Sequence, residues 1–252
     1  MGGRSSANCK LLAAVVSGLV ACLANQAAAP AGPASRPRES YAACDRPEVR
    51  VAADAPEIEI VCAALARVAS YFADAGFEID PQLTISFVDE IRDTPWPDSP
   101  HGYFDRARSE IVIARRAVDQ WWGLDDREEL LGSLHHELGH FAVAAVLGDE
   151  FGRLPRAWHE FIAYSVQLDL TTAGVREAVL ARNPDVPAFE TVFQVNDLLT
   201  GLLPPQLMAL MSYKAYRHWG EKSFLTRLLR FQVPMNCMND PTFPAGDTRC
   251  RQ

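Results

Sequence analysis

Residues 132–141, GSLHHELGHF, contain three of the six histidines of this 252-residue chain together with a glutamate. Imidazole nitrogens and carboxylate oxygens are ligands that zinc takes in proteins, so the segment is a candidate metal site. The alternative is a buried helix whose histidines bond to neighbouring backbone groups and hold no ion. The spacing of these residues and the rest of the chain bear on which interpretation is correct.

The spacing selects one pair of histidines. On an α-helix His136 and His140 lie one turn apart and about 40° around the axis, so both project from one face. His135 and His140 would diverge by about 140° and could not readily share an ion. Glu137 completes an HExxH motif, and its carboxylate would point to the side of the pair where an activated water lies. We therefore predict His136 and His140 as metal ligands and Glu137 as a general base.

A third ligand is expected on the next helix, because a catalytic zinc takes three protein ligands and keeps its fourth position open. The segment LPRAWHEFIAYSVQLDL follows a short loop that would send it back along the motif helix. Glu160 in this segment is our candidate, and Ala163 would let the two helices approach closely. His159 is a rival, but it points about 100° away from Glu160, so only one of them faces the site. We predict one Zn²⁺ per chain.

The elements that must position these residues follow from hydrophobic patterns. Strands are expected in EVRVAA and LTISFVDEI, and two more, joined by a polar turn, in HGYFDRARSEIVIA. A helix is expected from Asp54 to Gly76, and the motif helix over roughly 127–147. After residue 126 the pattern is mostly helical. The chain therefore predicts an α+β fold, in which a small mixed or antiparallel sheet with helices precedes a mostly helical half that carries the HExxH helix.

Composition indicates a globular protein with a substantial core, since 48% of the residues are hydrophobic. The formal net charge of −8 argues against nucleic acid as a partner, because the chain has no basic stripe to neutralise phosphates. We expect residues 47–252 to form a single domain and the protein to be a monomer.

The N-terminus has the order of a secretory signal peptide. Arg4 and Lys10 precede the apolar run LLAAVVSGLVACLA, which is too short to span a bilayer, and small residues follow. Two processing routes remain open over residues 1–29. Cleavage could follow the small residues 27–29, or the signal could end at Ala21, because LVAC resembles a bacterial lipobox that would place a lipid on Cys22. Residues 30–46, rich in proline, alanine and serine, are expected to be a flexible tether.

Export would place the remaining cysteines in an oxidising compartment. Cys44, Cys62, Cys237 and Cys250 could then form two disulfides with three connectivities. The local pairing, Cys44 with Cys62 and Cys237 with Cys250, closes short loops at the two ends of the domain. Four free thiols are the alternative, and the spacings are not those of a zinc ribbon.

The HExxH motif, with a glutamate twenty residues beyond it, resembles the gluzincin zinc metallopeptidases. Trp158, Glu160, Ala163 and Tyr164 are similar to the second active-site helix of the peptidase MA-like members. The segment GYFDRARSEIVIA is similar to the strand that precedes the motif helix in that group, where the substrate backbone pairs with this strand. The resemblance covers roughly residues 100–170 and implies a zincin-like fold. Phe161 stands where members often carry glycine.

A second departure concerns the surroundings of the metal ligands. Tyr164 occupies the position, one turn after Glu160, at which an Asp is expected. The residue that would support His136 is therefore not indicated by the resemblance.

The resemblance implies metal-assisted hydrolysis of peptide bonds in an exported bacterial protein. Glu137 would take a proton from water and pass it to the leaving amine. The substrate would be a peptide or protein of the periplasm or cell envelope, with membrane contact only through a lipid at Cys22. For the oxyanion donor, Tyr213, Tyr216 and His218 are candidates without a choice between them. The alternative function is a non-catalytic envelope-binding protein on a zincin-like scaffold.

Overall fold

The structure is a computed structural model of the chain. It describes residues 41–42, 44, 49–52, 55–80, 82–89, 91, 101–115, 122, 124 and 126–235, all within the compact unit Glu39–Gln252. The expected signal peptide, Cys22, Cys237 and Cys250 lie outside these residues, as does most of the expected tether. No helix in the described part of the chain is long and apolar enough to cross a membrane.

The described strands form one five-stranded mixed sheet in the order β1-β2-β3-β5-β4. Its β2–β3 and β3–β5 pairs are parallel, whereas β1–β2 and β5–β4 are antiparallel. The strands are β1 (Tyr41–Ala42), β2 (Val49–Ala52), β3 (Leu83–Val88), β4 (Gly102–Asp105) and β5 (Glu110–Ala114). The hairpin β4–β5 confirms the pair of strands expected in this segment. Strand β1 and Cys44 lie within residues 30–46, the segment that the sequence predicts to be a flexible tether.

Helix α1 (Ala55–Asp74) connects β2 to β3, because a parallel pair requires a crossover. Its inner face carries an apolar stripe, in which Leu65, Val68 and Phe72 are buried. Gly76 follows the helix with a φ of +84°, a left-handed conformation that suits glycine after a helix end. A disulfide joins Cys44 to Cys62 in α1, as the local pairing predicts.

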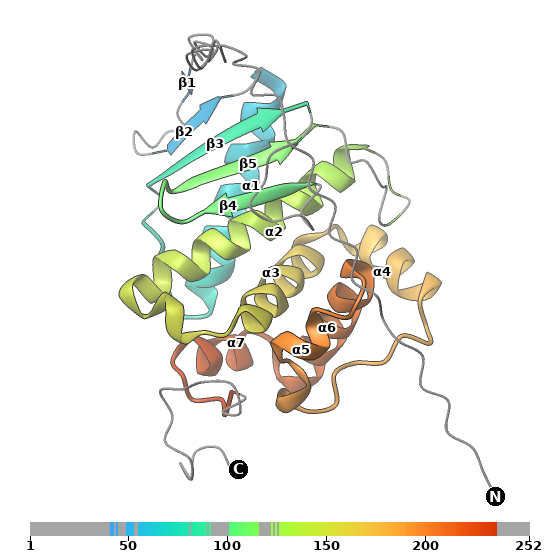
Figure 1. The fold of residues 1–252 in the computed structure, drawn as a ribbon. Helices are drawn as coiled ribbons and strands as arrows, with labels where there is room; N and C mark the ends of the chain where they lie inside the picture. The colour runs from blue at the N-terminus through green and yellow to red at the C-terminus, as the bar shows by residue number, and fades with distance from the viewer. Residues whose placement is uncertain are drawn as a thin grey trace, which may run out of the picture. The chain divides into compact units, whose positions relative to one another are not determined.

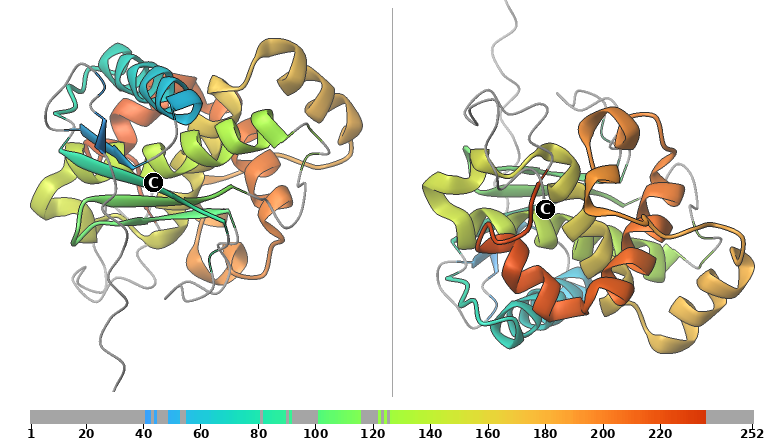
Figure 2. Two further views of the ribbon diagram at one scale, coloured as in Figure 1. Left: turned by 90° about the horizontal axis from the view of Figure 1, so that it is seen from above. Right: turned by 90° about the horizontal axis from the view of Figure 1, so that it is seen from below.

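The helical half begins with α2 (Asp126–Leu147), which contacts β4 and β5. Figure 1 shows α2 between the sheet and the next long helix, α3. Helix α3 in turn packs against α6, and α6 and α7 lie on the side of α3 opposite to the sheet (Figure 2). The elements after α2 are η1 (Gly148–Arg153), α3 (Arg156–Leu170), α4 (Ala173–Arg182), η2 (Val192–Gln194), α5 (Asp197–Thr200), α6 (Pro205–Trp219) and α7 (Glu221–Leu229). The α+β class is therefore confirmed.

Helices α2 and α3 form a close antiparallel pair. A Cβ added to Gly139 would lie 3.1 Å from the Cα of Ala163, so the two backbones approach at this point with almost no space between them. Gly148, with a φ of +51°, ends α2 and lets η1 turn the chain back. The first turn of α3 is capped from a distance, because a carboxylate oxygen of Asp197 accepts the backbone N–H of Ala157 at 2.7 Å.

Candidate metal centre

The antiparallel helix pair brings the three predicted ligands together. The Nε2 atoms of His136 and His140 are 3.1 Å apart. The Oε2 atom of Glu160 lies 3.4 Å from the first of these nitrogens and 3.7 Å from the second. These three residues form a group whose ligand atoms could hold one metal ion.

The dimensions of this triangle suit zinc. A tetrahedral Zn²⁺ with bonds of about 2.0–2.1 Å separates its ligand atoms by about 3.3–3.4 Å. The three separations here, 3.1, 3.4 and 3.7 Å, lie on either side of that value. Two imidazoles and one carboxylate are also a ligand set of catalytic zinc sites, in which the fourth position stays open. The residues present therefore fit the ion.

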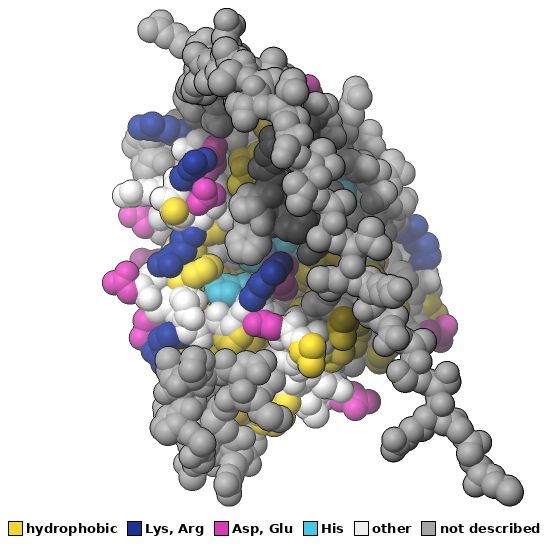
Figure 3. All heavy atoms as spheres, viewed as in Figure 1, with side chains coloured by type: hydrophobic (Ala, Val, Ile, Leu, Met, Phe, Trp, Pro, Cys, Tyr) yellow, Lys and Arg dark blue, Asp and Glu magenta, His cyan; other side chains and the backbone are white. Residues whose placement is uncertain are grey.

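The site is partly open to solvent. The side chains of His136 and His140 are 13% and 15% exposed, and that of Glu160 is 28% exposed. Histidine side chains are visible at the surface where α2 and α3 lie (Figure 3). A small molecule or an extended chain could thus approach the open side of the ligand triangle.

The pKa of Glu160 reflects its two partners. Burial by itself would raise the pKa of this carboxyl group. The neighbouring imidazoles of His140 and His136 outweigh burial and hold the pKa well below its ordinary value. Glu160 is therefore an anion at neutral pH, which is the form that ligates a metal.

The other two histidines of this region do not join the ligands. His135 is buried on a different side of α2, and burial, with the charge of Arg67 as a smaller cause, lowers its pKa to about 4. His159 turns to the loop before α3, where its Nε2 lies 3.0 Å from the carbonyl oxygen of Leu154. Its ring also packs on Phe151, with the centroids 4.2 Å apart. The rival ligand His159 is thus directed elsewhere.

Glu137 lies beside the ligands on a buried side of α2. Burial raises its pKa to about 7, and the charge of His140 is the largest opposing effect. The backbone N–H of Phe104 in β4 also points to this carboxylate. Gly102 is adjacent, because a Cβ added there would lie 3.0 Å from the Cγ of Glu137. The carboxylate is therefore held between the motif helix and strand β4.

Strand β4 is an edge strand of the sheet that the described residues form. The N–H of Ala114 bonds to the carbonyl of His101, so in the antiparallel ladder the backbone groups of Gly102 and Phe104 face away from β5. They face the side on which Glu137 lies. Unpaired groups on an edge strand can bind another extended chain.

Tyr164 is a residue of this site whose role the sequence did not indicate. Its ring packs on that of His136, with the centroids 4.4 Å apart. Burial, together with the charges of Glu160 and Glu137, raises its pKa well above 10, so its hydroxyl stays protonated. The sequence signals were its place in the run that resembles the second active-site helix and its position one helical turn after Glu160, and neither indicated a contact with His136.

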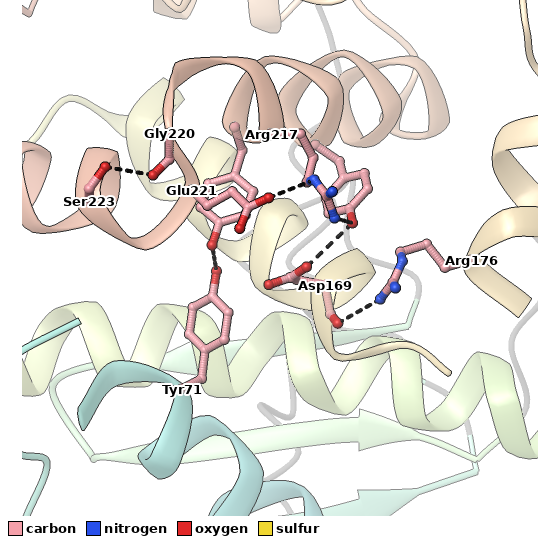
Figure 4. A network of polar contacts seen from close by, with 9 residues as sticks. Tyr71, Asp169, Arg176, Arg217, Gly220, Glu221 and Ser223 are labelled. Carbon is pink, nitrogen blue, oxygen red and sulfur yellow. Dashed lines mark hydrogen bonds and ion pairs between the residues drawn. The ribbon is translucent and has the colours of Figure 1, made fainter. Parts of the chain in front are cut away.

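The three candidate oxyanion donors are not brought to the ligands. Tyr216 accepts a hydrogen bond from Tyr71 at 2.5 Å, and the hydroxyl of Tyr213 lies 3.3 Å from Asp169. Asp169 is nine residues after Glu160, which is about 13 Å along α3. Figure 4 shows this network, with Tyr71 rising from α1 toward α6 and Asp169 directed to the same region. His218 is exposed on α6.

The comparison with protein families gives one match. Residues 49–236 match a family of unknown function, DUF6639. The chain belongs to this family. The region matched to DUF6639 contains all of β2 to α7, and with them the ligand triangle and Glu137. No curated protein and no solved structure matches the chain.

Proposed function

We propose that this protein is a zinc-dependent metallopeptidase with a zincin-like fold. The observation that carries the proposal is the convergence of His136, His140 and Glu160 beside the buried carboxylate of Glu137. A zinc ion held by the three ligands supplies Lewis acidity, which activates water at neutral pH and polarises a carbonyl group. A site with only a structural metal has no use for a carboxylate in the place of Glu137.

Glu137 is the general base in this proposal. In the metal-free protein burial raises its pKa to about 7. A bound cation would lower this pKa, so the carboxylate would be the form that meets the attacking water. It takes a proton from the attacking water and then delivers that proton to the leaving amine. Gly102 and the N–H of Phe104 fix the carboxylate so that the proton moves along a defined path.

Strand β4 is the proposed binding edge for the substrate. Apart from the N–H of Phe104, which bonds to Glu137, the backbone groups of Gly102 and Phe104 that face away from β5 would be available to the main chain of an extended polypeptide. The same strand passes Glu137, so a bound peptide bond would lie near the base. A polypeptide substrate is therefore favoured over a compact small molecule.

The proposed location is outside the cytoplasm, in the periplasm or cell envelope. The disulfide between Cys44 and Cys62 supports it, because such bonds persist mainly in oxidising compartments. The signal-like residues 1–29 are consistent with export, with Cys22 as the candidate site of a lipid anchor.

The experiment is hydrolysis of a mixture of fluorogenic peptides by the zinc-loaded full chain, compared with the variant Glu137→Gln. We expect the variant to lose activity by about 100-fold or more while it keeps its zinc. Glu177→Gln, which changes an exposed carboxylate on α4, is the matched control and should retain full activity. Hydrolysis that survives Glu137→Gln would refute the mechanism. Zinc binding without hydrolysis in the wild type would favour the non-catalytic binding protein.

A further inference from the structure

The imidazole of His136 lacks the support that metal-ligating histidines usually have. Its Nε2 faces the other two ligands, and its Nδ1 is buried without a hydrogen-bond partner in the structure described here. A ligating histidine normally donates its second N–H to a carboxylate, a carbonyl or water, which fixes the orientation of the ring. Another contact must therefore hold this ring.

That contact comes from aromatic rings on two sides. Tyr164 packs on His136 at a centroid distance of 4.4 Å, with the ring planes inclined by 57°. The ring of His140 lies on another side at 4.8 Å, nearly perpendicular to that of His136. Tyr164 is itself only 7% exposed, so its position is determined by the surrounding core.

The position of Tyr164 is fixed by the same helix contact that builds the site. It follows Ala163, whose Cα lies against Gly139 of α2 where the two helices approach closely. It also lies one turn beyond Glu160, on the same face of α3. One helix therefore presents both a ligand and a ring that packs on a ligand.

We propose that Tyr164 is a positioning residue for the metal centre, and that its aromatic ring, not its hydroxyl group, holds the imidazole of His136 in the ligating orientation. Packing thus replaces the hydrogen bond that other metal sites use. This inference rests on the proposed zinc site. It adds that the affinity for zinc depends on a ring at position 164.

The test is the zinc dissociation constant of the full chain, measured by competition with a chromophoric chelator. Tyr164→Phe keeps the ring and should bind zinc as the wild type does. Tyr164→Leu removes the ring and should weaken zinc binding by about 10- to 100-fold, the range found when other supports of metal ligands are lost. The absorption spectrum of the cobalt-substituted protein should be unchanged in the first variant and altered in the second.

Phe161→Leu is the matched control for general damage to the core. Phe161 is a buried ring on the same helix, but it packs against Trp219 and Phe224, away from the ligands. This variant should lose stability and keep its zinc affinity.

The outcomes separate this inference from the proposed function. Wild-type affinity in Tyr164→Leu would overturn the inference and leave the metal centre intact. Equal weakening in the Phe and Leu variants would also overturn it, since the hydroxyl group would then be responsible. Equal weakening in Phe161→Leu would show a general effect of packing, against the specific role of Tyr164. A wild-type chain that binds no zinc would refute the metal centre itself, and this inference with it.

Discussion

The buried carboxyl group of Glu137 should make the stability of the zinc-free protein depend on pH. Burial raises its pKa from the ordinary value of 4.5 to about 7. The folded state therefore binds this proton more tightly than the unfolded state does. As the pH rises through this interval, the folded state either keeps a proton that the unfolded state has released or loses it and carries a buried charge. Both cost free energy, so the free energy of unfolding falls.

The size of the effect follows from the two pKa values. At about 1.4 kcal/mol for each pKa unit, the carboxyl group removes roughly 3 kcal/mol of stability between pH 4.5 and 7. The contribution is favourable below pH 4.5 and fully lost above pH 7. Glu137→Gln cannot ionise, so its stability relative to the wild type should rise by this amount over the same interval.

Urea unfolding at a series of pH values between 4.5 and 8 measures the difference. The samples contain a chelator, because a bound cation would lower the pKa of the carboxyl group. His135 and His159, with pKa values near 4, change the stability of both proteins in the same way, so their effect cancels in the comparison. Glu177→Gln should follow the wild type at every pH.

Parallel curves for the wild type and Glu137→Gln would refute this reasoning, because the carboxyl group would then have the same pKa in the folded and unfolded chains. A difference of opposite sign, with the wild type gaining stability as the pH rises, would mean that Glu137 is ion-paired in the folded state. Either result would contradict the raised pKa of Glu137 in the zinc-free protein.

Three further predictions concern the scaffold of the site. Gly139→Ala should lower the free energy of unfolding by about 1–3 kcal/mol in a urea titration and weaken zinc binding, because its Cβ would press on the backbone of α3. The control Gly174→Ala should lose no stability in the same titration, because a Cβ added there has no atom within 4 Å. Replacing both Cys44 and Cys62, which are 18 residues apart, by serine should cost about 3 kcal/mol, measured by urea unfolding against the oxidised wild type. Asp197→Ala should cost about 1 kcal/mol by thermal unfolding, since α3 loses the acceptor for its first turn.

The convergence of the three candidate ligands could be predicted because helix geometry converts sequence spacing into direction. A separation of four positions places His136 and His140 on one face of a helix, whatever the rest of the fold. Glu160 required one more assumption, that the short loop around Gly148 folds α3 back on α2. The structure has this arrangement, and a left-handed φ at Gly148 allows it.

Long-range pairing could not be predicted in the same way. The β4–β5 hairpin joins strands that are adjacent in the sequence, and the polar turn between them predicts their pairing. The parallel pairs of β3 with β2 and β5 join segments far apart in the chain, and alternation of apolar residues does not say which strands are neighbours. The sequence therefore left open whether the sheet was mixed or antiparallel.

Contacts between side chains on different helices were also beyond the sequence. Tyr213 and Tyr216 have the chemistry of oxyanion donors, but α6 directs them into the core near Asp169. Tyr164 belongs to the run that resembles the second active-site helix, but its packing on His136 depends on the closeness of α2 and α3 at Gly139 and could not be predicted. Residue type shows which chemistry a side chain could support, whereas the packing of the helices decides whether that side chain reaches the site.

The zinc content of the purified full chain, measured after metal-replete dialysis, tests the central claim most directly. We predict close to one zinc ion per chain in the wild type and in Glu137→Gln, and strong loss of zinc in Glu160→Ala. A folded wild type that refuses zinc, or a Glu160→Ala variant that binds it as well as the wild type does, would contradict the three-ligand metal centre.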